Sequence, residues 1–119
     1  MTKSKSKKLL TDFFMLMALT TTVSYVVNPN IYELITALTL NLVATILKIG
    51  TRGMLSVEYL ATSIVADFHL IPALMVDLAG SQQEAISLAW GALVANIVSV
   101  VIMLVEAILG SLTEEEGEF

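Results

Sequence analysis

The sequence contains no cysteine, a single histidine and few charged residues. Without cysteine the chain can form neither disulfides nor thiolate metal sites, and one histidine cannot supply the several imidazoles of a multi-histidine zinc or bis-histidine haem site. The glycine motifs of phosphate loops, dinucleotide-binding turns and nucleophile elbows are also absent. We therefore expect no enzyme, no cofactor and no metal centre.

Charged residues make up only 14% of the 119 residues, whereas soluble domains contain about 25%. The formal net charge is −5, which argues against a nucleic-acid partner. Hydrophobic residues reach 56%, and the mean hydropathy is +0.84. A membrane protein is the class that this composition favours.

The apolar residues are concentrated in four segments, 9–27, 31–49, 59–78 and 85–105. Each is about 20 residues long, the length of helix that crosses a hydrocarbon core of about 30 Å. We predict a single all-α, polytopic membrane domain over 1–119, with these segments as transmembrane helices in an up-down bundle. A basic stretch, 1–8, precedes them, and an acidic tail, 111–119, follows.

The basic residues favour one orientation. Lysines occupy the N-terminal stretch, and a lysine and an arginine flank the connection between the second and third segments: Lys3, Lys5, Lys7, Lys8, Lys48 and Arg52. In an up-down bundle all of them lie on the same side of the membrane. The positive-inside rule then predicts that both termini are cytoplasmic.

Polar side chains occur near the middle of every predicted helix. They are Thr21, Asn41, Ser63, Asp67, His69 and Asn96. An ionised aspartate at the bilayer centre costs about 2.5–3.5 kcal/mol on insertion scales, so we expect these groups to meet in one buried polar layer. The two asparagine amides are suitable hydrogen-bond partners for the Asp67 carboxyl group. Asparagine in membrane helices also commonly serves only to join helices, which is the structural alternative.

The segment around Asp67 has a second unusual feature. Asp67 and His69 are two residues apart, so they point to nearly opposite sides of a helix. Pro72 lacks an N–H group and clashes with the carbonyl group of Phe68. We predict a kink there that lets water or a polar partner reach that carbonyl oxygen.

Two stretches, LVATILKIGTRG at 42–53 and YLATSIVADFHLIPA at 59–73, carry a resemblance to a known family. They resemble the central part of a small bacterial inner-membrane family described only as a domain of unknown function. The resemblance implies location in the bacterial inner membrane and no particular activity.

Two functions remain open on the sequence. The favoured one is a non-enzymatic subunit that joins a larger membrane complex or forms a homo-oligomer, in contact with the lipid bilayer. The alternative is a small proton or cation channel or transporter that uses the polar layer around Asp67 and His69.

Overall fold

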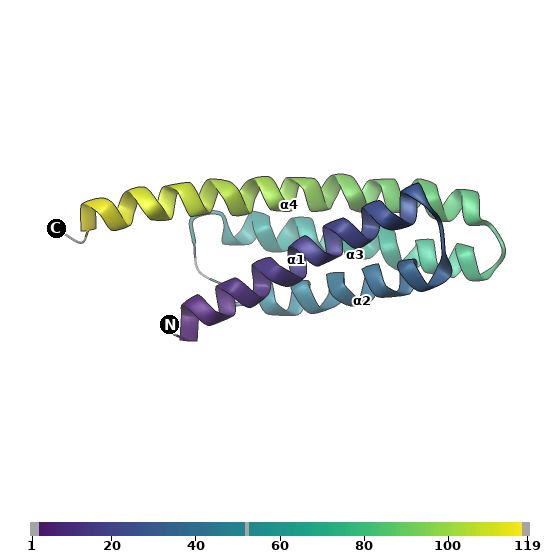
Figure 1. The fold of residues 1–119 in the computed structure, drawn as a ribbon, viewed down its shortest axis with the longest axis horizontal. Helices are drawn as coiled ribbons and strands as arrows, with labels where there is room; N and C mark the ends of the chain where they lie inside the picture. Colours follow the sequence, from purple (N-terminus) through teal and green to yellow (C-terminus); the bar gives the residue numbers. More distant parts are fainter. Residues whose placement is uncertain (1–2, 52, 118–119) are drawn as a thin grey trace.

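The computed structural model describes residues 3–51 and 53–117, and these residues form four α-helices in an antiparallel bundle (Figure 1). The helices are α1 (Lys3–Val27), α2 (Ile31–Lys48), α3 (Ser56–Leu78) and α4 (Gln82–Gly117). Each is long and apolar enough to cross a membrane. The predicted all-α fold with an apolar helix for each predicted segment is confirmed, and it indicates a multi-pass membrane protein.

The helices pack in a ring in which α1 contacts α2 and α4, and α3 contacts the same two helices. The bundle is 59 Å long and 22 by 21 Å across. Both chain termini and the α2–α3 connection lie at one end, which we call the termini end (Figure 1). The α1–α2 and α3–α4 turns lie at the opposite end, the hairpin end.

The turns follow from local chemistry. Asn30 caps α2, because its side-chain oxygen accepts a hydrogen bond from the backbone N–H of Tyr32 at 2.8 Å. The other two connections contain Gly50 and Gly80, whose φ angles of 80° and 95° suit glycine. These short connections hold consecutive helices side by side.

α3 begins three residues before its predicted segment, and two other helices extend much further. α1 already begins at Lys3, and α4 continues to Gly117 instead of ending near 105. The apolar pattern marks what can lie in lipid, whereas lysine and glutamate propagate a helix into water about as well as leucine does. α3 also continues through Pro72 without interruption, so the predicted kink does not break the helix.

The core of the hairpin end is apolar and consists largely of alanine. It contains Tyr25, Leu34, Ala66, Leu70, Ala73, Ala85, Ala89, Ala92 and Ala95. Small side chains let membrane helices approach closely, which replaces the hydrophobic driving force that lipid does not provide. The phenol of Tyr25 donates a hydrogen bond to Asp77 at 2.6 Å and links α1 to the end of α3.

His69 packs against α4. Its Nδ1 atom lies 2.8 Å from the carbonyl oxygen of Val65, and its ring lies against Gly91 of α4. A Cβ atom on Gly91 would overlap this ring. Glycine is therefore required at this position as long as the imidazole occupies its present place.

We predict that Gly91→Ala destabilises the bundle by about 1–3 kcal/mol, the usual cost of overpacking. The measurement is the thermal unfolding midpoint of the purified protein in detergent. Gly110→Ala is the matched control, because no atom lies within 4 Å of the added methyl group. Adding His69→Ala to the Gly91 variant should restore most of the loss. Equal midpoints for the two single variants would contradict this account of the contact.

Candidate functional site

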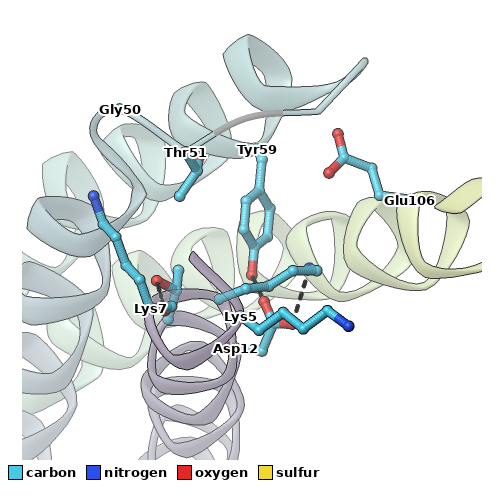
Figure 2. A pocket seen from close by; sticks show the side chains of 9 residues that line it. Lys5, Lys7, Asp12, Gly50, Thr51, Tyr59 and Glu106 are labelled. Atoms are coloured by element: carbon cyan, nitrogen blue, oxygen red, sulfur yellow. Dashed lines mark hydrogen bonds and ion pairs between the residues drawn. The ribbon is translucent and has the colours of Figure 1, made fainter. Parts of the chain in front are cut away.

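A pocket of about 300 Å³ opens at the termini end (Figure 2). Side chains from α1, the α2–α3 connection, α3 and α4 surround it. They are Lys5, Lys7, Lys8, Thr11, Asp12, Gly50, Thr51, Tyr59 and Glu106. Both carboxylates already have partners: Asp12 pairs with Lys8 at 3.1 Å, and Glu106 accepts a hydrogen bond from the backbone N–H of Leu55 at 2.5 Å.

Tyr59 separates this pocket from the interior of the bundle. Its hydroxyl group points toward α1 and donates to Asp12 at 2.9 Å (Figure 2). The ammonium group of Lys48 lies 4.1 Å from the centre of the tyrosine ring. Because Tyr59 is only 4% exposed, its ring fills the space between the pocket and the buried lysine.

Lys48 is the most unexpected residue of the core, because it is a lysine with only 2% of its surface exposed. Its Nζ atom donates to the hydroxyl oxygen of Ser99 at 3.1 Å, and Ser99 forms a hydrogen bond with Thr62. Within the described residues Lys48 forms no ion pair with a carboxylate, and a hydroxyl group and an aromatic face lie against the ammonium group. This arrangement joins α2, α3 and α4 at the termini end.

Asp67 lies deeper in the bundle and is 5% exposed. Its Oδ2 atom lies 2.5 Å from the hydroxyl oxygen of Thr45 on α2. The same hydroxyl oxygen lies 2.6 Å from the hydroxyl of Ser63 and 2.8 Å from the carbonyl oxygen of Asn41. The other carboxyl oxygen, Oδ1, is buried and has no hydrogen-bond partner.

The structure buries several of the predicted polar residues, but their contacts differ from the expected ones. Asn41 is buried and donates to the carbonyl oxygen of Ala37 in its own helix at 3.2 Å. Asn96 is 1% exposed, and its Nδ2 atom has no partner. The carboxyl group of Asp67 therefore bonds to a threonine hydroxyl and to neither amide.

His69 and Thr21 lie apart from the side chains that surround Asp67 and Lys48. The ring of His69 faces Gly91 and its own helix, as described above. Thr21 donates to the carbonyl oxygen of Met17 at 2.7 Å and lines a small hollow near the hairpin end. Pro72 lies more than one helical turn beyond Asp67 toward the hairpin end.

The predicted topology determinants are also distributed unevenly. Lys5, Lys7 and Lys8 line the pocket at the termini end, whereas Lys48 is buried in the core. Arg52 and the side chain of Lys3 lie outside the described residues.

Sequence reasoning missed the residues that hold Asp67 and Lys48, namely Thr45, Tyr59, Thr62 and Ser99. Helical spacing could have found them, because Asn41, Thr45 and Lys48 follow one another on one face of α2. Asn96 and Ser99 share a face of α4 in the same way. Among hydroxyl residues only Thr21 and Ser63 were predicted in the polar layer, and Lys48 was predicted only as a topology determinant.

Within residues 3–51 and 53–117, no group of three or more histidine, aspartate or glutamate residues could hold a metal ion. What the described core offers is a connected set of hydroxyl, carboxyl and ammonium groups. Such groups bind and pass protons or bind small ions.

The helices and this core define a class: a small, polytopic α-helical membrane protein with a polar interior at one end and an apolar interior at the other. The chain belongs to a family of unknown function, DUF6394, whose sequence profile matches residues 28–107. This confirms the resemblance to an uncharacterised family. The match covers α2, α3 and most of α4, and it includes Lys48, Asp67 and their hydroxyl partners. No curated protein and no solved structure matches the chain.

Proposed function

We propose that this protein is a non-enzymatic membrane protein that binds a proton or a small cation at Asp67 and exchanges it through the pocket at the termini end. The observation that carries the proposal is the buried carboxyl group with one unpartnered oxygen atom. Buried ionisable groups in membrane helices are costly and are functional by default. Between this carboxyl group and the termini end lie a buried lysine and a pocket lined with polar side chains.

Access to Asp67 is one-sided in this arrangement. Toward the termini end the buried side chains include Ser63, Ser99, Lys48 and Tyr59, and the pocket follows. Toward the hairpin end the helices close over the alanine-rich cluster, whose one polar group is the Tyr25 phenol, already bonded to Asp77. A single copy therefore resembles a half-pathway, with polar side chains leading to a Tyr59 barrier at one end and an apolar core at the other.

We further propose that the termini end is cytoplasmic and that the membrane is the bacterial inner membrane. The support is the positive-inside rule, since the described lysines of α1 and the buried Lys48 all belong to the termini end. The exchange of ions at Asp67 would then take place with the cytoplasm.

Cysteine labelling tests orientation and access together, because the natural chain contains no cysteine. Ser81→Cys, in the α3–α4 turn, should react with a membrane-impermeant thiol reagent added to intact cells. Ser99→Cys should stay unreactive from both sides until Tyr59→Ala removes the barrier, and it should then react only in inverted vesicles. Labelling of position 81 only in inverted vesicles would reverse the orientation. Equal labelling of position 99 with and without Tyr59 would refute the barrier.

Two substitutions of Asp67 test the ion site. Asp67→Asn keeps the shape of the side chain and removes its titratable group, whereas Asp67→Leu removes hydrogen bonding as well. We expect proton or cation flux in reconstituted liposomes to fall at least about tenfold in both variants, a loss that corresponds to about 1.4 kcal/mol. The Asn variant should still fold and assemble as the natural protein does. The matched control, Asp77→Asn, alters a carboxyl group that lies near the hairpin end and bonds to Tyr25. Unchanged flux in a folded Asp67→Asn protein would refute the ion-site proposal.

A second candidate function is that of a subunit in a homo-oligomer, and the extension of α4 favours it. This helix projects beyond the rest of the bundle at the termini end (Figure 1). It carries the exposed apolar side chains Ile108 and Leu112, and glutamates follow at 114–116. The acidic segment of one copy complements the basic N-terminal stretch of a neighbouring copy at the same end.

Native mass determination after purification in mild detergent tests the subunit function. We expect a homo-oligomer for the natural protein and a lower mass for the double variant Ile108→Gln and Leu112→Gln. The double variant Val94→Gln and Ile97→Gln, on the exposed surface of α4 within the bundle, is the matched control. A monomer in the natural protein would exclude self-assembly, and co-purified foreign chains would indicate a mixed complex instead.

A further inference from the structure

We propose that the ligand of the Asp67 site is a proton, and that the structure holds Asp67 as a neutral carboxylic acid whose O–H group donates to Thr45. The inference rests on the proposed function only for the importance of this site. It goes further, because it selects the proton over a metal cation and names the contact that retains it.

The contacts of the Thr45 hydroxyl oxygen need more hydrogen atoms than the neighbouring hydroxyl groups supply. Three oxygen atoms lie within hydrogen-bond distance of it: Asp67 Oδ2 at 2.5 Å, Ser63 Oγ at 2.6 Å and the carbonyl oxygen of Asn41 at 2.8 Å. Each contact needs one hydrogen atom. The two hydroxyl groups supply one each, and a backbone carbonyl supplies none. The third hydrogen atom therefore belongs to the carboxyl group.

The neutral form satisfies every contact. The O–H group of Asp67 donates to Thr45, Ser63 donates to the second lone pair of Thr45, and Thr45 donates to the carbonyl oxygen of Asn41. With an ionised carboxylate, Thr45 would face two acceptors with one hydrogen atom. One pair of oxygen atoms would then lie at 2.5 or 2.8 Å with no hydrogen atom between them, which is repulsive.

The neighbouring cluster around Lys48 has enough hydrogen atoms for all of its hydrogen bonds. Lys48 donates to Ser99, Ser99 donates to Thr62, and Thr62 donates to the carbonyl oxygen of Tyr59 at 2.9 Å. The three contacts use three hydrogen atoms that these groups always carry. The shortage of hydrogen atoms is therefore specific to the Thr45 cluster and is relieved by protonating Asp67.

The unpartnered Oδ1 atom of Asp67 also favours the neutral form of the carboxyl group. In a carboxylic acid this atom is a neutral carbonyl oxygen, and leaving it without a partner costs far less than leaving half of a carboxylate charge without one. Among the described residues, no positively charged side chain forms an ion pair with this carboxyl group. Lys48, the cation facing the core from α2, contacts Ser99 and the Tyr59 ring and not Asp67.

The remaining titratable groups around the core are engaged elsewhere. On α3 itself, Tyr59 donates to Asp12 and His69 packs against Gly91. From α4 the nearest described acid toward the pocket is Glu106, which bonds to the start of α3. From α1, Asp12 pairs with Lys8 at the pocket.

A metal cation fits this site poorly. Calcium and magnesium ions need six or more oxygen ligands, several of them free to turn toward the ion. Among the described buried side chains, the unpartnered polar atoms are Asp67 Oδ1 and Asn96 Nδ2. The second is an amide donor, which repels cations.

Release of the proton is simple to balance. The O–H bond of Asp67 breaks, its electron pair stays on Oδ2, and a water molecule entering from the pocket accepts the proton. Thr45 then has one hydrogen atom for two acceptors and must leave either Asn41 or Asp67. The proton thus also holds α2 and α3 together at this level, and its loss weakens that contact.

Infrared spectroscopy of the full-length protein in lipid tests the inference without reference to transport. At neutral pH we expect the C=O stretching band of a protonated carboxyl group, shifted by exchange into heavy water and absent in Asp67→Asn. Thr45→Val removes the acceptor of the acidic hydrogen atom and should move the same band to higher frequency. Asp12→Asn, which alters a carboxylate paired with Lys8, is the matched control and should leave the band unchanged.

The outcomes separate the two proposals. Absence of any protonated-carboxyl band in the natural protein at neutral pH overturns the inference, and this measurement needs no variant that must fold. If flux still depends on Asp67 in that case, the proposed function stands and its ligand is a cation. If the band is present and belongs to Asp67, the inference stands even where the flux assay fails.

Discussion

Burial of polar side chains inside a bundle that faces lipid is the constraint on which the rest of this structure depends. Hydrocarbon offers no hydrogen-bond partner, so each polar atom must find one within the protein or pay several kcal/mol in free energy, roughly 2–7 by transfer measurements. At the termini end this requirement joins α2, α3 and α4 through Thr45, Ser63, Ser99 and the Lys48 ammonium group. These contacts add to the apolar packing of Met15, Ala44 and Tyr59 at the same end.

The hairpin end meets the same requirement in the opposite way, because it buries almost no polar side chains. Alanine side chains let the backbones approach, and threonine hydroxyls such as that of Thr22 bond to carbonyl oxygens of their own helix. The bundle is thus built on two different principles along its length. Asp67 lies at the boundary between them, where an ionisable group is reached from one side only.

The fold could be predicted almost completely from the sequence, because lipid imposes a length and an apolarity on each helix that composition alone reveals. The ends of α1 and α4 could not, since the lysines that begin α1 and the glutamates that end α4 extend these helices without a hydropathy signal. Burial of Asp67, Asn41, Ser63 and Asn96 followed from their depth. The partners did not follow, because which face of α2 meets α3 depends on packing. Lys48 was misjudged because a lysine beside a connection usually reaches water.

The alanine-rich core of the hairpin end has a mechanical consequence. Alanine side chains have no rotamers to exchange, so the closely packed helices there have few side chains that can rearrange. At the termini end, by contrast, long side chains such as Lys48 and Tyr59 fill the space and can swing. The stiffness of the molecule therefore changes along its axis. Any opening of the bundle is smallest at the hairpin end and largest at the termini end.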